Sequence, residues 1–175
     1  MISLVGLPGS GKTTVGRQLA RRLQLPFVDA DHAIEEYLGC SIRTFFEEKG
    51  ESKFRDIEAL VIDKLLQTHQ GVLSTGGGAI LREDNRKRLH ASGFVIYLSS
   101  SPQVLFRRLR HDVNRPLLQV ADPMDKLFEL YKIRDPLYRQ TAHFSVETGA
   151  PSVSKLVNMI IMQIELREFE SKDLE

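Results

Sequence analysis

The stretch Gly6 to Thr13 has the sequence GLPGSGKT and fits the pattern G-x-x-x-x-G-K-[ST]. The apolar run Ile2 to Val5 comes directly before it and predicts a buried strand. After it, residues 14–23 repeat apolar side chains at helical spacing. A strand, a glycine-rich turn and a helix start are the context in which this pattern binds phosphate. We therefore predict that the chain folds around a phosphate-binding loop (P-loop).

The chemistry of this loop follows from its residue types. Its glycines let the backbone turn tightly and approach a ligand closely, so that successive N–H groups can form a nest for an anion. The helix N-terminus adds unpaired donors and partial positive charge. Lys12 can reach the β- and γ-phosphates of a nucleoside triphosphate, and the Thr13 hydroxyl can ligate Mg²⁺. A chance match in a glycine-rich loop is the alternative, and the flanking strand and helix favour the nucleotide site.

Length and composition indicate one globular domain. A chain of 175 residues with 42% hydrophobic and 27% charged residues can bury a substantial core. Its net charge of +1 gives no case for attraction to nucleic acid or to a membrane surface. The single cysteine excludes an internal disulfide and suits a reducing cytosol. Because the first predicted strand starts almost at once, we expect no signal peptide and a cytoplasmic location.

Strand and helix patterns alternate along the rest of the chain. Four further strands are predicted around 25–31, 71–75, 94–98 and 144–147, and helices at 33–38, 41–47, 51–69, 83–91, 101–110, 123–138 and 152–167. The segment 111–122 lacks periodicity and predicts a loop. The alternation predicts an α/β fold, with a central five-stranded parallel sheet flanked by helices in a three-layer sandwich.

Two acids follow the second predicted strand. In an extended chain, Asp29 and Asp31 would point to one side, at the sheet edge where ligands of such folds bind. One carboxylate would then hold a metal-bound water, and the other would accept a proton or hydrogen bond from an acceptor hydroxyl. The alternative is a turn or a cap for the next helix.

Three consecutive glycines and several arginines complete the candidate groups. Gly76 to Gly78 predict either backbone close to a ligand or a long turn. Arg115, in the predicted loop, could neutralise charge on a transferred phosphoryl group, although an arginine before proline is usually solvated. Arg55 and Arg134 could together grip a carboxylate. The basic run 107–110 is either a solvated helix end or a source of a side chain that stacks on adenine.

Together these motifs resemble the shikimate kinase family, small P-loop kinases of the nucleoside-monophosphate-kinase structural group. The resemblance covers nearly the whole chain, and the motifs after the P-loop make it specific. The matching segments are 6–17 (GLPGSGKTTVGR), 29–31 (DAD), 54–58 (FRDIE), 74–78 (STGGG), 114–118 (NRPLL) and 134–138 (RDPLY).

The resemblance implies ATP-dependent phosphorylation of the 3-hydroxyl of shikimate, in the pathway to chorismate and aromatic amino acids. It implies that Mg²⁺ is held by Thr13 and, through water, by Asp29. It assigns Asp31 to the ring hydroxyls, as the general base. The implied ATP-binding residues are Gly9, Ser10, Gly11, Lys12, Thr13, Thr14, Arg115, Arg108 against adenine and Pro151 in the loop near adenine; Lys12, Asp31 and Arg115 are the implied catalytic residues.

The resemblance also implies a pocket for the acid. Its implied residues are Asp31, Phe46, Phe54, Arg55, Gly76, Gly77, Gly78 and Arg134, with the two arginines on the carboxylate. Within one kinase domain, 1–175, we expect a substrate-binding helical segment at about 32–61 and a lid at about 111–122. A charge-rich tail at about 166–175 could fray. We expect a monomer that binds ATP and shikimate, without nucleic-acid or membrane partners.

Two rival functions remain open from the residues alone. The chain could be another small-molecule kinase on this scaffold, for a sugar acid such as gluconate or for a nucleotide. It could instead be a non-catalytic nucleotide-binding switch. Asp31 beside a set of acid-binding arginines argues against a switch, which needs no carboxylate clamp.

Overall fold

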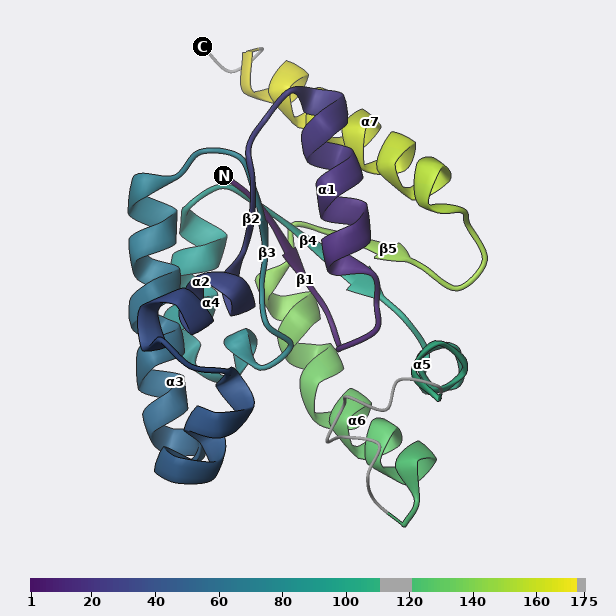
Figure 1. Cartoon of the computed structure of the whole chain (residues 1–175). Coiled ribbons are helices and arrows are strands. Elements are labelled where there is room, and N and C mark those ends of the chain that lie inside the picture. Colours follow the sequence, from purple (N-terminus) through teal and green to yellow (C-terminus); the bar gives the residue numbers. More distant parts are fainter. Residues whose placement is uncertain (111–120, 173–175) are drawn as a thin grey trace.

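A computed structural model describes residues 1–110 and 121–172 of the chain (Figure 1). Its centre is a five-stranded sheet in the order β2-β3-β1-β4-β5, with every neighbouring pair parallel. The predicted five-stranded parallel sheet is therefore confirmed. The strands are β1 (Ile2–Val5), β2 (Phe27–Asp29), β3 (Val72–Ser74), β4 (Phe94–Ser99) and β5 (Phe144–Glu147).

The helices connect these strands as predicted, with differences in detail. Helix α3 is broken by the non-helical Gly50, so it contains the two helices expected from the sequence. The last helix extends to Lys172, beyond its predicted end, and a short 3₁₀ turn after β3 was not predicted. The helical elements are α1 (Lys12–Leu23), α2 (Ala30–Leu38), α3 (Ile42–Thr68), η1 (Ala79–Leu81), α4 (Glu83–Ala91), α5 (Pro102–Leu109), α6 (Pro123–Thr141) and α7 (Val153–Lys172). Within 1–110 and 121–172, none of the helices has the length and apolar character to cross a membrane.

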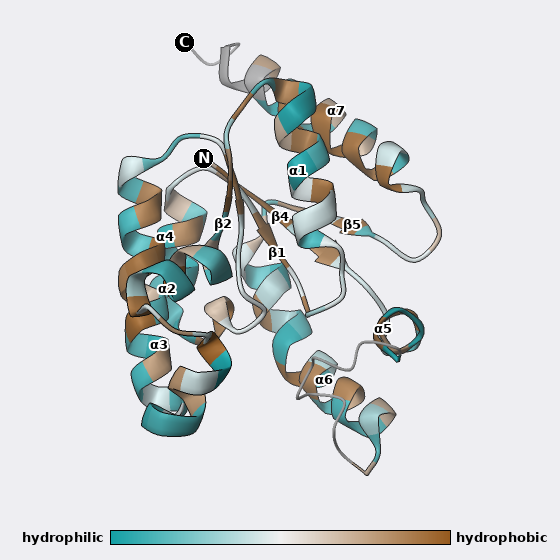
Figure 2. Cartoon of the chain, viewed as in Figure 1, coloured by the Kyte–Doolittle hydropathy of each residue, from teal (hydrophilic) through white to brown (hydrophobic). Residues whose placement is uncertain are grey.

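Two hydrophobic layers lie on either side of the sheet. In β4, Ile96 and Leu98 pack in the layer that contains residues of α1 and α7, while Val95 and Tyr97 pack in the opposite layer with α3, α4 and α6. This alternation follows from the two-residue period of a strand. Figure 2 shows the apolar strands enclosed between helices. Since both faces of the sheet are covered, its ligand-binding surface is left to the strand ends.

Three strand ends meet at the same edge of the sheet. Because the strands are parallel, the chain leaves β1, β2 and β3 on one side: into the P-loop, into α2 and into the glycine turn Gly76–Gly78. Strand β3 lies between β1 and β2, and Leu4, Ser74 and Asp29 are in register. The fold therefore places the P-loop, the two acids and the glycine turn next to one another.

Candidate functional site

The P-loop forms an open cradle at the start of α1. Gly9 and Gly11 have φ of 84° and 96°, a region that side chains rarely adopt, and a Cβ on Gly9 would lie 2.8 Å from the Leu109 side chain. Gly11 supplies no side-chain cap, and the first turn of α1 carries no acidic residue. The first-turn amides are therefore suited to an anionic ligand.

Lys12 lies against this loop. Its side chain is buried, with Nζ donating to the carbonyl oxygens of Gly6 at 2.8 Å and Leu7 at 3.0 Å. These two hydrogen bonds hold the side chain beside the loop. The long side chain is thus placed where the phosphates of a nucleotide would lie over the first-turn amides.

Asp29 connects the loop to the neighbouring strand. Its Oδ2 accepts a hydrogen bond from the Thr13 hydroxyl at 2.9 Å, and its Oδ1 caps α2 by accepting from the Asp31 backbone N–H at 3.1 Å. The alternative role of this carboxylate, a cap for the next helix, is therefore confirmed, and Asp29 contacts the P-loop at the same time. The expectation of an extended Asp29–Asp31 segment is wrong, because α2 begins at Ala30 and Asp31 lies in its first turn.

A cavity of about 560 Å³ joins these groups. Asp29 and Asp31 line it together with P-loop residues, and so does Gly77 of the glycine turn. The predicted nucleotide-binding residues that line the same cavity are Gly9, Ser10, Gly11, Lys12, Thr13, Thr14, Arg108 and Pro151. The groups suited to bind phosphate and the carboxylates of Asp29 and Asp31 therefore line the same cavity.

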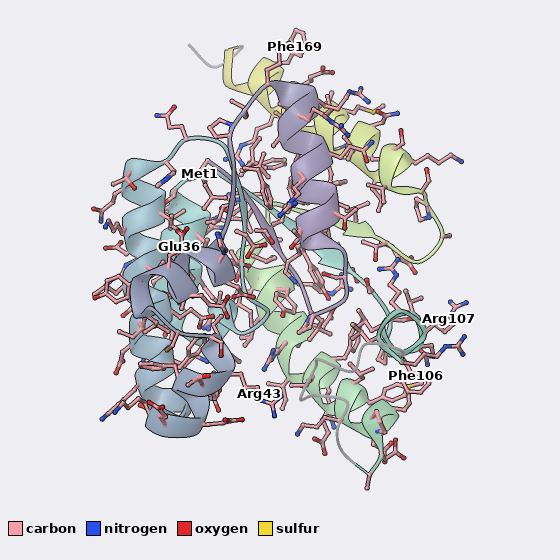
Figure 3. All side chains as sticks on the ribbon, in the orientation of Figure 1. Met1, Glu36, Arg43, Phe106, Arg107 and Phe169 are labelled. Atoms are coloured by element: carbon pink, nitrogen blue, oxygen red, sulfur yellow. The ribbon has the colours of Figure 1, made fainter. Side chains whose placement is uncertain are left out.

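Arg108 reaches the P-loop from α5. Its Nη1 donates to the Gly9 carbonyl at 3.2 Å and to the Thr148 hydroxyl at 3.1 Å, and its Nη2 donates to the Thr148 carbonyl. Burial lowers the pKa of the Arg108 guanidinium, helped by the neighbouring charge of Arg107. Figure 3 marks Arg107 on α5, on one side of the strand ends, and Arg43 at the start of α3, on the other. Thr148 had no predicted role, and here it anchors Arg108 beside Pro151 in the cavity.

The glycine turn is tightly enclosed on three sides. A Cβ on Gly76 would lie 2.6 Å from Asp31 Oδ1, and one on Gly77 would lie 2.7 Å from Pro8 of the P-loop. A Cβ on Gly78 would lie 2.3 Å from the Arg55 guanidinium. A Cβ at any of these positions would force its neighbour to shift, so glycine allows the close approach. The turn thus joins the acid Asp31, the P-loop and Arg55.

Two phenylalanine rings pack beside the Arg55 guanidinium. The rings of Phe46 and Phe54 lie 4.7 Å apart, and the guanidinium lies over both, 6.0 and 5.2 Å from the ring centroids. Arg55 Nη1 also donates to Glu58 at 2.6 Å, and Nη2 to the exposed Glu51 at 3.2 Å. The structure therefore brings the three predicted pocket residues together in α3.

Glu58 is a site residue that the sequence reasoning missed. It is 2% exposed, and burial raises the pKa of its carboxyl, although the Arg55 guanidinium acts in the opposite direction. The charges of Asp31 and Arg134 also act on this carboxyl. The signal was present in the FRDIE motif, because residues three apart share a helical face. Glu58 thus holds the Arg55 side chain in place through this ion pair.

Arg134 contacts the glycine turn from α6. Its Nη1 donates to the Gly77 carbonyl at 3.2 Å, and the Tyr138 hydroxyl donates to the same oxygen at 2.5 Å. Arg55 and Arg134 therefore reach adjacent residues of one turn, and their role as a carboxylate clamp stays a prediction. Tyr138 had no predicted role, although its four-residue spacing from Arg134 could have indicated a shared face.

Arg115 is the one predicted site residue that lies outside the described residues, together with most of the predicted lid. Its role stays a prediction. The remaining predicted residues fall in two adjoining groups: the cavity above the P-loop, and the Phe46–Phe54–Arg55 cluster with Arg134 beyond the glycine turn.

Known proteins resemble this chain over almost its whole length. The sequence model of the shikimate kinase family matches residues 8–165. A shikimate kinase of Burkholderia thailandensis is 56% identical over 174 residues, covering 99% of this chain and 95% of the relative. A gluconokinase from Sinorhizobium meliloti, with a TM-score of 0.56 and 18% identity over 97% of this chain and 96% of its own, shares the fold alone.

A solved shikimate kinase from Acinetobacter baumannii, in complex with shikimate, superposes with a TM-score of 0.90 and 45% identity. That match covers 95% of this chain and 93% of the other. With a family model that runs from the P-loop to the final helix, this chain belongs to the shikimate kinase family.

Proposed function

We propose that this chain transfers the γ-phosphoryl group of ATP to the 3-hydroxyl of shikimate, giving shikimate 3-phosphate and ADP. The family model and the relatives carry the name of this activity, shikimate kinase. The observation that carries the proposal is the glycine turn, which contacts Asp31, Pro8 of the P-loop and the Arg55 guanidinium through consecutive residues. A phosphoryl donor and an acidic acceptor would thus bind side by side.

The chain's own groups account for the transfer. The P-loop amides and Lys12 hold the phosphates and neutralise charge as the γ-phosphoryl group moves. Asp31 faces the same cavity and accepts the proton of the attacking hydroxyl. Catalysis is then mainly positioning and charge stabilisation, since phosphoryl transfer needs little covalent help from the protein.

The carboxylate of shikimate binds between Arg55 and Arg134. Guanidinium groups pair with carboxylates through two parallel N–H donors, which fixes orientation as well as binding energy. Glu58 and the Phe46–Phe54 wall hold Arg55 in place. The ring hydroxyls would then extend from the clamp along the glycine turn toward Asp31.

The loss of Arg134 should mainly weaken acid binding. Arg134→Ala removes one guanidinium, so we expect the KM for shikimate to rise about 10- to 100-fold, with a smaller change in kcat. Steady-state kinetics at saturating ATP measure both. Arg139→Ala is the control, because Arg139 lies on the same helix and pairs with Asp135. An unchanged KM in Arg134→Ala would remove the carboxylate clamp.

Mg²⁺ is the metal that this site fits. The Thr13 hydroxyl and the Asp29 carboxylate are hard oxygen donors, and their oxygens lie 2.9 Å apart beside the P-loop. We propose that Thr13 ligates the ion directly and Asp29 through water. When bound, the ion would supply positive charge that offsets the negative charge of the phosphates.

Thr13→Ala should raise the Mg²⁺ requirement. Loss of the hydroxyl removes one oxygen donor, so we expect the Mg²⁺ concentration for half-maximal activity to rise on the order of tenfold. Titration of Mg²⁺ at fixed ATP measures this, and the KM for shikimate serves as the internal control. An unaltered Mg²⁺ dependence would contradict the assignment of Thr13.

A coupled ADP-release assay tests the function directly. We expect rapid turnover with shikimate and none above background with gluconate or AMP, and phosphorus NMR should identify shikimate 3-phosphate. Comparable turnover with gluconate would favour a sugar-acid kinase. Nucleotide binding without turnover on any acceptor would favour a switch.

The monomeric state and the cytoplasmic location stay predictions. Gel filtration with light scattering measures the oligomeric state.

A further inference from the structure

Two donors from α6 converge on one backbone oxygen. The Gly77 carbonyl accepts from Arg134 at 3.2 Å and from the Tyr138 hydroxyl at 2.5 Å. A carbonyl oxygen has two lone pairs, so these bonds account for its full acceptor capacity. Arg134 and Tyr138 lie one helical turn apart, which places both side chains on the same face of α6.

This carbonyl controls the orientation of a peptide in the glycine turn. The Gly77 C=O and the Gly78 N–H belong to one planar trans unit and point in opposite directions. Between two glycines such a unit has little intrinsic preference, because neither residue carries a Cβ. Holding the oxygen toward α6 therefore directs the Gly78 N–H away from α6, and Gly78 is the residue that adjoins Arg55.

The Tyr138 hydroxyl is built to be a permanent donor. The side chain is fully buried, and its ring stacks on Tyr97 with centroids 4.9 Å apart. Burial raises the pKa of the phenol well above its ordinary value, against the opposing effect of Arg134. The phenol thus stays protonated at any pH at which the protein is folded and active. Ring packing against Tyr97 fixes its position.

We propose that Tyr138 is a positioning residue for the acid substrate, an inference that rests on the function proposed above. Its hydroxyl holds the Gly77–Gly78 peptide in the orientation that receives shikimate. The Tyr138 hydroxyl also lets Arg134 bind the substrate carboxylate. If the guanidinium leaves the Gly77 carbonyl to do so, that oxygen still accepts a hydrogen bond from Tyr138. The buried phenol of Tyr138 thus acts on the acceptor site through the Gly77 carbonyl.

Tyr138→Phe and Tyr97→Phe form a matched pair for the test. Each removes one hydroxyl from the same ring stack, but the Tyr97 hydroxyl donates to Asp135 at 2.8 Å and not to the glycine turn. For Tyr138→Phe we expect the KM for shikimate to rise about fivefold, with the KM for ATP unchanged. Binding of shikimate without nucleotide, measured by calorimetry, should weaken in parallel. Tyr97→Phe should leave both shikimate values unchanged.

A purely structural hydroxyl would give a different result. If both variants lose similar thermal stability and Tyr138→Phe keeps the wild-type KM and affinity for shikimate, the proposal is overturned. If Tyr138→Phe does not fold, the proposal is tested instead by the Gly78 amide signal in ¹⁵N spectra of the wild-type protein. A large shift on shikimate saturation supports a pre-set peptide that receives the ligand, and an unchanged signal contradicts it. A wild-type protein without shikimate turnover would refute the proposed function instead.

Discussion

Replacing Lys12 by alanine should lower kcat by about 10³-fold or more, the largest effect of any single change proposed here. The Lys12 ammonium is buried against the P-loop, where water screens it poorly. The loss should fall mainly on the transition state, because the charge on the transferred group spreads as it moves. Single-turnover kinetics with ATP and shikimate measure it.

The fold of the Lys12→Ala protein needs its own check. The substitution leaves the Gly6 and Leu7 carbonyls without the Nζ donor, so thermal unfolding and shikimate binding should be measured alongside activity. Lys87→Ala is the control for the loss of a lysine, since that side chain pairs with Glu83 on the exposed surface of α4. Activity of Lys12→Ala within tenfold of the wild type, roughly the effect of one ordinary hydrogen bond, would contradict the role of Lys12.

Asp31→Asn should give the second largest loss, about 10²- to 10³-fold in kcat. The amide has the size of the carboxylate but cannot take the proton from the attacking hydroxyl. Binding should change much less, because the Arg55–Arg134 clamp and the P-loop are retained. The pH dependence of kcat should also lose its acidic limb if Asp31 is the proton acceptor.

Asp56→Asn is the matched control for Asp31→Asn. Asp56 pairs with Arg82 on the exposed side of α3, away from the cavity. We expect full activity from it. If Asp31→Asn kept the wild-type kcat and pH profile, the carboxylate would only orient the substrate, and another group would have to accept the proton.

The sequence was informative wherever a local pattern has one physical meaning. The P-loop motif predicted a strand, a turn and a helix together, because this spacing of glycines and lysine binds phosphate only between a strand and a helix start. Alternation of apolar strands and helices predicted the parallel sheet, and parallel strands place their carboxyl ends at one edge. The closeness of Asp31 to the glycine turn follows from that edge alone.

Other features depend on contacts that no local pattern carries. The start of α2 at Ala30 reflects capping by Asp29, which competes with the extended chain that we expected. Helical spacing places Glu58 and Tyr138 on the same faces as Arg55 and Arg134, but their closeness to the glycine turn comes from tertiary packing that the spacing does not predict. The anchoring of Arg108 by Thr148 joins residues 40 positions apart, and no spacing rule predicts it.

A crystal structure with ADP and shikimate bound tests the central claim most directly. The account predicts shikimate beside the glycine turn, with its carboxylate on Arg55 and Arg134 and its 3-hydroxyl within hydrogen-bond distance of Asp31. The ADP phosphates should lie on the first-turn amides of α1. Shikimate bound elsewhere, with its carboxylate remote from both arginines while ADP occupies the P-loop, would contradict it.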